Sequence, residues 1–245
     1  MKSVLSKEET FDNGECEIKH LFLKKNNSSK LLVVFSGFPP AGKKRSYNYV
    51  LKFRDLECNK LYILDEFGAD ERGSYYLGKD KDFFITKAVS QLIEQVASKH
   101  NISKNDIITA GSSKGGYASL YYAFKNGYGA TVVGAPQTLL GDYLAHPVHR
   151  DILQYIAGGE SSKDIEYLNN VLFDIVKSSE KIPNVYLNVS TGDHHYLSHV
   201  VPLTNLLEQS QIKYRLDLDE YEEHGDVGKY FPTFAQIIIK DELSN

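Results

Sequence analysis

The sequence predicts an α/β protein whose mostly parallel sheet is covered by helices on both faces. Apolar runs of strand length alternate with longer segments whose apolar residues recur at helical spacing. Several of the short runs are apolar throughout, as expected for strands that are buried on both faces. The 245 residues contain no internal repeat, low-complexity tract or linker, so we expect one domain over residues 1–245.

The strands are predicted from the short apolar runs. Leu31–Phe35 is apolar throughout, and Glu15–Leu23 before it alternates in polarity, which is typical of an antiparallel strand at a sheet edge. The remaining expected strands are Leu61–Leu64, Asp106–Thr109, Ala130–Val133, Val185–Val189 and Tyr214–Leu218.

The helices are predicted from apolar residues that recur every three or four positions. Phe84–Lys99 shows this spacing on one face, and Tyr117–Lys125, Val201–Gln209 and Phe231–Asp241 follow the same pattern. Residues 144–183 depart from the alternation, because they contain helical patterns and no evident strand. Two interpretations stay open for this segment: a small cap over the site, or an ordinary helical crossover with a loop.

Composition and charge exclude several classes of function. The formal net charge of −4 leaves no basic surplus for binding nucleic acid. Cys16 and Cys58 suit a reducing compartment better than a disulfide scaffold. No apolar run approaches the ~18 residues of a membrane span, and Met1–Thr10 lacks the apolar stretch of a signal peptide. We therefore expect a soluble cytoplasmic protein, and the sequence does not predict its oligomeric state.

A nucleophile motif, Gly111-Ser112-Ser113-Lys114-Gly115, lies between an expected strand and an expected helix. In this context the central serine of Gly-x-Ser-x-Gly occupies a strained turn, and the two glycines avoid a clash around it. The helix that follows directs the backbone amide of Lys114 toward the oxyanion of a tetrahedral intermediate. We therefore expect Ser113 to be a catalytic nucleophile.

The catalytic acid and base are expected later in the chain, in the order serine, acid, histidine. His224 is the only histidine after the last expected strand, which makes it the expected base. Asp193 follows the expected strand Val185–Val189 and is the expected acid that orients His224. The alternative acids are those close to the base in sequence: Asp217, Asp219 and Glu220.

Two backbone amides are expected to stabilise the oxyanion, those of Lys114 and Phe38. Phe38 follows the buried strand Leu31–Phe35, and the two prolines after it have no amide hydrogen to donate. Gly37 in the same loop is expected to line the substrate pocket. The side chain of Lys114 has two interpretations, projection into solvent or binding of an acidic group on the substrate.

Aromatic and histidine side chains are candidates for substrate contact. Four tyrosines can stack on sugar rings or pack in the core, namely Tyr47, Tyr49, Tyr75 and Tyr76. His194 and His195 directly follow Asp193 and are expected to line the rim of the pocket.

One competing interpretation is a nucleotide-binding protein. Residues 37–43 match Gly-x4-Gly-Lys, the start of a phosphate-binding loop, and Leu61–Glu66 resembles a strand whose terminal acids hold magnesium. However, Lys44 stands where serine or threonine should ligate the metal. Pro39 and Pro40 also remove amides that would bind the phosphates.

A second competing interpretation is a metal site formed by Asp193, His194, His195 and His199. No glutamate follows His195, as the helix of a metalloprotease requires, so we expect no metal and no cofactor. A third interpretation is a binding protein that kept the fold and lost the chemistry, since a fold alone never establishes activity.

Short motifs along the chain carry a family resemblance. In order they are Phe35-Ser36-Gly37-Phe38, Tyr47-Asn48-Tyr49, Leu64-Asp65-Glu66-Phe67-Gly68, Gly73-Ser74-Tyr75-Tyr76-Leu77, Gly111-Ser112-Ser113-Lys114-Gly115-Gly116, Gly134-Ala135-Pro136-Gln137 and Glu223-His224-Gly225-Asp226. Together they resemble α/β-hydrolase-like proteins of bacterial capsular polysaccharide biosynthesis loci. They are also similar to the hydrolase-like domain of accessory Sec-system proteins that O-acetylate glycans. The resemblance covers about residues 30–235.

The resemblance implies an α/β-hydrolase fold and an esterase or O-acyltransferase that acts on acylated carbohydrate through an acyl-enzyme. By motif match, Ser113 is the nucleophile and His224 the base. The acid departs from the usual pattern. Many α/β-hydrolases place it three residues after the loop glycine, where this chain has His195, whereas Asp193 directly follows Gly192.

Overall fold

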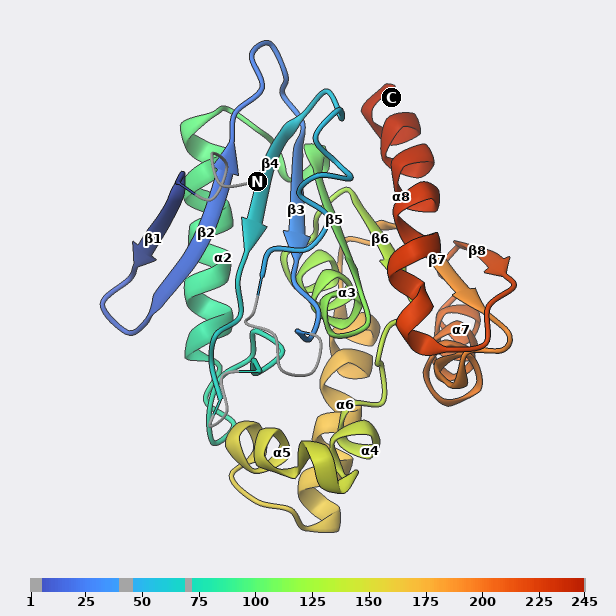
Figure 1. Cartoon of the computed structure of the whole chain (residues 1–245). Helices are drawn as coiled ribbons and strands as arrows, with labels where there is room; N and C mark the ends of the chain where they lie inside the picture. The colour runs from blue at the N-terminus through green and yellow to red at the C-terminus, as the bar shows by residue number, and fades with distance from the viewer. Residues whose placement is uncertain (1–5, 40–45, 69–71, 245) are drawn as a thin grey trace.

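The sheet has eight strands and is parallel over most of its width. A computed structural model describes residues 6–39, 46–68 and 72–244 (Figure 1). The strand order is β1-β2-β4-β3-β5-β6-β7-β8, and only β1 and β2 run antiparallel to their neighbours. The strands are β1 (Glu8–Asp12), β2 (Glu17–Leu23), β3 (Leu31–Phe35), β4 (Asn59–Ile63), β5 (Ile107–Ser112), β6 (Ala130–Gly134), β7 (Asn184–Ser190) and β8 (Tyr214–Asp219).

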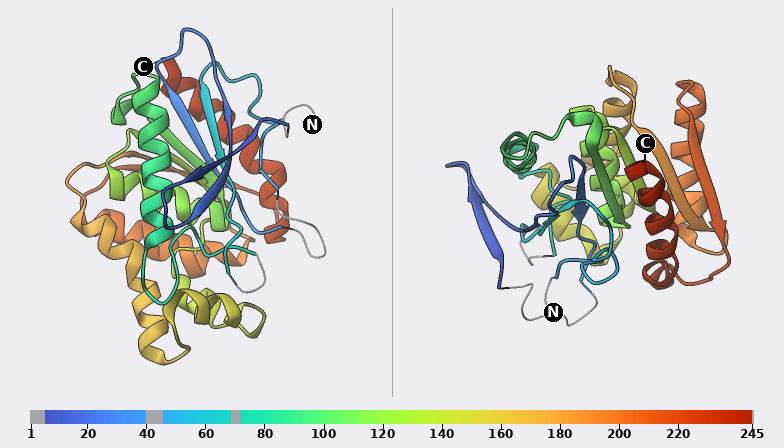
Figure 2. Two further views of the ribbon diagram at one scale, coloured as in Figure 1. Left: turned by 90° about the vertical axis from the view of Figure 1, so that its left-hand side faces the viewer. Right: turned by 90° about the horizontal axis from the view of Figure 1, so that it is seen from above.

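Helices cover both faces of this sheet. Figure 2 shows α2 (Phe84–Lys99) and α3 (Lys114–Asn126) on one face and α8 (Val227–Ser244) on the other. Strands β3 to β6 are buried along their whole length between these layers. The fold class predicted from the sequence, an α/β-hydrolase fold with a mostly parallel sheet, is therefore confirmed.

Residues 144–183 form α5 (Arg150–Ala157) and α6 (Ser162–Ser178), and they contain no strand. The short α4 (Leu140–Leu144) and α5 lie beyond the carboxyl ends of the strands, while α6 packs against α3 (Figure 1). Helix α6 begins with a capping box, in which Ser161 and Asp164 each accept a hydrogen bond from the backbone amide of the other. A covering role for this segment stays a prediction.

One strand prediction is wrong in its detail. Glu15–Leu23 was expected to be the edge strand, but β1 pairs with β2 and forms the edge instead. The sequence of β1 is Glu-Glu-Thr-Phe-Asp, and it is mostly exposed. It therefore lacks the apolar residues from which a strand is recognised. The helix α7 (Val201–Gln209) and the strand β3 have the predicted bounds. No helix in residues 6–39, 46–68 or 72–244 is long and apolar enough to cross a membrane.

The turn between β5 and α3 depends on two glycines. Ser113 has φ of 56° and ψ of −121°, a conformation that is strained for a residue with a side chain. A Cβ atom on Gly111 would lie 2.4 Å from the carbonyl oxygen of Gly115, and a Cβ atom on Gly115 would lie 2.4 Å from that of Phe35. The backbone atoms around this turn are therefore too close for any side chain at positions 111 and 115.

We predict that Gly115→Ala lowers the free energy of unfolding by about 1–3 kcal/mol, because the methyl group must push apart α3 and the end of β3. Chemical denaturation measures this change. Gly228→Ala in α8 is the matched control, since nothing lies within 4 Å of its Cβ position. The control variant should be as stable as the wild type or more so. Equal effects of the two substitutions would contradict the packing argument.

Candidate active site

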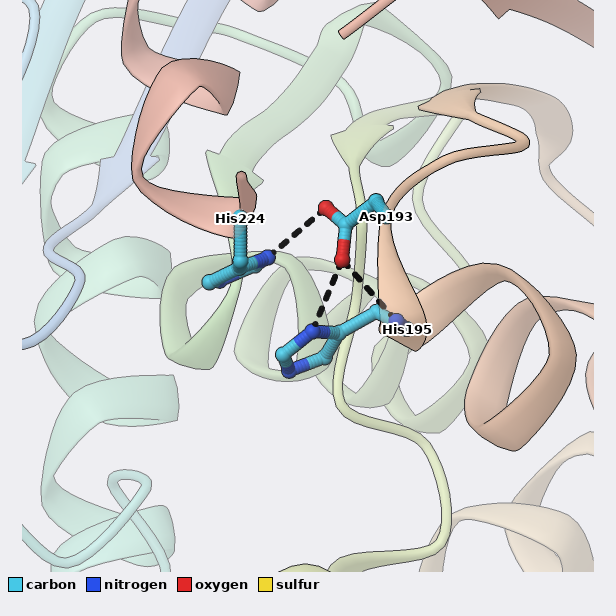
Figure 3. A group of neighbouring side chains, drawn as sticks. All are labelled: Asp193, His195 and His224. Atoms are coloured by element: carbon cyan, nitrogen blue, oxygen red, sulfur yellow. Dashed lines mark hydrogen bonds and ion pairs between the residues drawn. The ribbon is translucent and has the colours of Figure 1, made fainter. Parts of the chain in front are cut away.

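Ser113, His224 and Asp193 form a connected chain at the carboxyl ends of the strands. The Ser113 Oγ atom lies 3.0 Å from His224 Nε2, and His224 Nδ1 lies 2.8 Å from Asp193 Oδ2. Asp193 comes from the loop after β7 and His224 from the turn after β8 (Figure 3). A serine within hydrogen-bond reach of an imidazole that a carboxylate orients is the arrangement that activates a nucleophile.

The alternative acids are engaged elsewhere or are not in contact with the base. Asp217 pairs with Arg215 at 2.7 Å, and Asp219 accepts a hydrogen bond from Asn188 at 2.8 Å. Glu220 has no interaction with His224 in the described parts of the chain. Asp193 is therefore the one of the four acids considered that reaches the base.

The Asp193 carboxylate is buried, and both of its oxygens accept hydrogen bonds. Oδ1 accepts from the backbone amide of His195 at 2.9 Å and faces His195 Nδ1 at 3.1 Å. Oδ2 accepts from His224 and, at 3.3 Å, from the hydroxyl of Tyr221. Burial alone would raise the pKa of Asp193, but the hydrogen bonds from His195 and His224 outweigh it and hold the pKa far below its usual range. The acid is thus ionised.

The Lys114 amide directly follows Ser113, and the Phe38 amide belongs to the loop after β3; their binding of an oxyanion stays a prediction. Lys114 is the first residue of α3, where helix amides have no partner within the helix. The amide of Phe38 has no hydrogen-bond partner among residues 6–39, 46–68 and 72–244. The amide of Gly37 donates to Asn48 Oδ1 at 2.9 Å, so Gly37 anchors the loop. A contact of Gly37 with substrate stays a prediction.

Both interpretations of the Lys114 side chain are wrong. The side chain is only 1% exposed, and its Nζ atom lies 2.8 Å from Oδ2 of the fully buried Asp65. Burial lowers the pKa of Lys114, and the ion pair with Asp65 opposes that change. The Nζ atom also lies 5.5 Å from the centre of the Phe38 ring, so the lysine packs against the loop after β3. Asp65 cannot serve as a magnesium ligand while Lys114 occupies it.

The phosphate-loop interpretation rests partly on residues outside the described chain. Pro40 and residues 41–45, which include Gly42, Lys43 and Lys44, belong to that part. The burial of Asp65 against Lys114 removes one of the two terminal acids, Asp65 and Glu66, on which the interpretation relied.

The predicted substrate contacts of Tyr75 and Tyr76 are contradicted. Both side chains are completely buried, so neither ring is available to stack on a sugar. The Tyr75 hydroxyl donates to Gln137 Oε1 at 2.6 Å. The Tyr76 hydroxyl donates to the Ile63 carbonyl at 2.9 Å and accepts from the amide of Ser36 at 2.7 Å. These tyrosines support the loops of the site from the interior, and both of their hydroxyls are hydrogen-bonded.

The other two tyrosines also pack within the protein. Tyr47 donates to Glu8 at 2.7 Å, and the Tyr49 hydroxyl lies 2.5 Å from Oγ of Ser112, the residue before Ser113. Burial raises the pKa of Tyr49 to about 12, so its hydroxyl keeps its proton.

Two neighbouring histidines have opposite environments. His194 is exposed, as expected for the rim of a pocket, and its contact with substrate stays a prediction. His195 was also expected at the rim, but its side chain is 1% exposed. It lies stacked on His224, with ring centres 3.7 Å apart and an interplanar angle of 24°. His195 is therefore part of the support of Asp193 and is not a substrate contact.

The predicted metal set does not come together as proposed. Among the described residues, the atoms that lie close enough to share an ion belong to Asp193, His195 and His224. His199 is excluded because its Nδ1 accepts from the amide of Leu139 at 3.2 Å. A metal on the first three residues would have to displace the imidazole protons that face Asp193. The arrangement of Asp193, His195 and His224 therefore fits hydrogen bonding better than metal ligation.

An aromatic stack joins the segment 144–183 to Phe38 in the loop after β3. The ring of His149 lies 5.7 Å from that of Phe38 with an interplanar angle of 3°, and 4.7 Å from that of Tyr143. The Tyr143 ring lies 5.7 Å from His195. This stack forms a wall between the loop after β3 and the histidines after β7.

Three residues support the site in roles that the sequence did not predict. Asp65 pairs with Lys114, Tyr221 bonds to Asp193, and Gln137 lies between Tyr75 and His195. Gln137 follows the end of β6, so its position at the carboxyl end of a parallel strand was the available signal.

No family model matches the chain. An accessory Sec system protein of Staphylococcus aureus (strain NCTC 8325 / PS 47) is 21% identical over 245 residues, which cover 95% of this chain. The chain spans 45% of the length of that curated relative.

Solved structures show the same fold. The capsule O-acetyltransferase of Neisseria meningitidis serogroup A superposes with a TM-score of 0.81 at 22% identity, covering 96% of this chain and 94% of that chain. The fluorophosphonate-binding serine hydrolase F of Staphylococcus aureus matches with a TM-score of 0.71 at 12% identity, covering 97% and 98%. These similarities confirm the resemblance expected from the motifs.

We predict that Lys114→Met lowers the free energy of unfolding by about 3–5 kcal/mol, because Asp65 is left buried without its partner. Adding Asp65→Asn should recover part of this loss, so the two changes should be far from additive in a double-mutant cycle. Lys87→Met is the control. It removes an exposed pair with Glu15 and should cost less than about 1 kcal/mol. Additive effects at Lys114 and Asp65 would contradict a direct pairing.

A second prediction concerns stability at acid pH. Burial lowers the pKa of His195 to about 4 and that of His199 to about 3, whereas a histidine in the unfolded chain has a pKa of about 6.5. Between these pKa values the unfolded chain binds more protons than the folded protein. The contribution of each buried histidine to the free energy of unfolding is therefore fully present above about pH 6.5 and is lost as the pH decreases. Between pH 7 and 5 each buried histidine should cost about 1–2 kcal/mol.

Urea unfolding of His199→Gln at both pH values tests this prediction. The variant should lose less stability on acidification than the wild type does. The exposed His146 serves as the control, and His146→Gln should follow the wild type. An equally steep loss in His199→Gln would show that His199 does not contribute.

Proposed function

We propose that the chain is a serine-dependent O-acyltransferase that moves an acyl group from a coenzyme A thioester to a hydroxyl of a carbohydrate. The observation that carries the proposal is the chain from Ser113 through His224 to Asp193, held on a strained turn after β5. The α/β-hydrolase fold and the likeness to an O-acetyltransferase and to serine hydrolases support acyl chemistry.

The donor and the acceptor are inferred from relatives. A histidine-to-alanine mutant of the Neisseria enzyme has been solved in complex with CoA, which supports a thioester as the donor here. That enzyme is named for its capsule, which supports a carbohydrate acceptor. An esterase that releases the same acyl group to water differs only in the second step.

In the first step Ser113 Oγ attacks the thioester carbonyl while its proton passes to His224 Nε2. The amides of Lys114 and Phe38 stabilise the negative oxygen of the tetrahedral intermediate. The intermediate collapses by breaking the carbon–sulfur bond, and the sulfur leaves as a thiol with the proton from His224. Ser113 is now acylated.

The second step runs the same chemistry in the opposite direction. An acceptor hydroxyl gives its proton to His224 Nε2 as its oxygen attacks the acyl-enzyme. The bond to Ser113 Oγ then breaks, and His224 returns the proton to the serine. Asp193 keeps His224 in the correct tautomer and stabilises the imidazolium that forms in each step.

We predict that a fluorophosphonate adds once to the wild-type protein and not to Ser113→Ala, as measured by intact mass. Acetyl-CoA should likewise add one acetyl group to the wild type alone. Asp193→Asn should slow labelling by about 10³-fold or more, because the base loses its orientation. Asp217→Asn is the matched control and should label at the wild-type rate, since Asp217 pairs with Arg215. No adduct on folded wild-type protein would favour a non-catalytic binding protein.

A further inference from the structure

The carboxylate of Asp193 is shared between two imidazoles. His224 bonds to Oδ2, and His195 approaches Oδ1 with both its backbone amide and its ring Nδ1 (Figure 3). A role for His195 is not needed to complete the chain from Ser113 to Asp193. Its position nevertheless places a second ring, fully buried, against the same acid and against the face of the base.

The partners of His195 fix its tautomer. An ionised carboxylate only accepts hydrogen bonds, so Nδ1 of His195 carries the proton and donates it to Asp193. Nε2 is then an acceptor, and it lies 3.3 Å from Nε2 of Gln137, which donates. Gln137 Oε1 in turn accepts from the Tyr75 hydroxyl at 2.6 Å. Tyr75 and Gln137 are completely buried, so no water competes for these bonds.

All three hydrogen bonds in this series are donated in the direction of Asp193. Tyr75 donates to Gln137, Gln137 to His195, and His195 to the carboxylate. A proton added to His195 Nε2 would face the amide hydrogens of Gln137, so the network favours a neutral ring. Burial lowers the pKa of His195 to about 4, in agreement with this geometry.

A neutral His195 matters because the base beside it becomes charged. When His224 takes the proton of Ser113, a second cation at 3.7 Å would repel it, whereas a neutral ring does not. The Nδ1–H group of His195 also stabilises part of the negative charge of Asp193. A carboxylate bonded to two imidazoles holds the proton on either one less strongly than a carboxylate bonded to one.

Other polar groups around the pair act on it more weakly. The Tyr221 hydroxyl lies 3.3 Å from Asp193 Oδ2, and His194 Nδ1 lies 3.6 Å from Oδ1 at the surface. The ring of His199 lies 5.0 Å from His195, and the ring of Tyr143 lies 5.7 Å from it. His224 itself faces Ser113 Oγ and the ring of His194, whose centre lies 5.7 Å from that of His224.

We propose that His195 is a positioning residue that divides the charge of Asp193 and so sets the pH at which His224 works as a base, with Gln137 and Tyr75 holding it in place. This inference rests on the proposed function for its catalytic meaning. It assigns to His195 no contact with substrate.

Two substitutions at position 195 test the proposal. His195→Leu removes both ring nitrogens, whereas His195→Asn keeps an N–H donor close to the position of Nδ1. The rate of fluorophosphonate labelling is measured against pH for both variants and the wild type. NMR of the imidazole Cε1–H group, with the spectrum assigned through His224→Gln, follows the titration of His224 without need of activity.

We expect the midpoint of both pH curves to rise by about 0.5–1 pH unit in His195→Leu, because Asp193 then gives its whole charge to His224. Labelling at neutral pH should fall by up to about threefold to tenfold, because a midpoint raised by that amount leaves less of the base unprotonated. His195→Asn should return the midpoint and most of the rate. Gln137→Met, which removes the donor to His195 Nε2, should shift the midpoint in the same direction by less.

The outcomes separate the two proposals. A folded His195→Leu whose NMR midpoint equals that of the wild type overturns the role of His195, whatever its labelling rate. A His195→Asn variant that behaves like His195→Leu would also overturn it, because the donor would then not be the cause. If the wild type is not labelled but the NMR midpoint shifts as expected, the proposed function fails and the division of charge stands.

Discussion

The buried ion pair of Lys114 and Asp65 holds the site together. A charge that is buried without a partner of opposite sign costs several kcal/mol of desolvation free energy, so a buried lysine and a buried aspartate stabilise the fold only as a pair. Lys114 begins α3 directly after the nucleophile, and Asp65 lies just after β4. Asp65 also accepts from the backbone amides of Ser74 and Tyr76. The Tyr76 hydroxyl then accepts from the amide of Ser36, at the start of the loop after β3. The turn at Ser113 and the loop after β3 are thus both tied to one carboxylate.

The two buried carboxylates of the site are neutralised by different chemistry. Asp65 faces a fixed cation, which makes a strong pairing that does not change during a reaction. Asp193 faces two imidazoles and a hydroxyl, whose protons are held by hydrogen bonds. An imidazole such as that of His224 is a group that can take up a proton and return it, whereas the buried His195 stays neutral. One acid therefore suits a structural task and the other a task in proton transfer.

The sequence predicts those features that depend on local pattern. The apolar run of β3 and the spacing of apolar residues in α2 give their bounds, and the order of motifs places Ser113, Asp193 and His224 at the ends of strands. It fails where a distant partner decides the outcome. Lys114 lies 49 positions from Asp65, and nothing around a lysine in a glycine-rich turn indicates that it is buried. The same holds for His195, whose burial depends on Gln137 and on the ring of His224.

The distribution of the site along the chain bears on when the protein becomes reactive during its synthesis. Ser113 and His224 are separated by 111 positions, and His224 follows β8, which pairs only with β7 at the edge of the sheet. A ribosome releases the segments in order, and a contact between distant segments forms late. Ser113 therefore leaves the ribosome well before His224 does. The connection from Ser113 to Asp193 can form only after β8 and the turn that follows it have been synthesised and have docked.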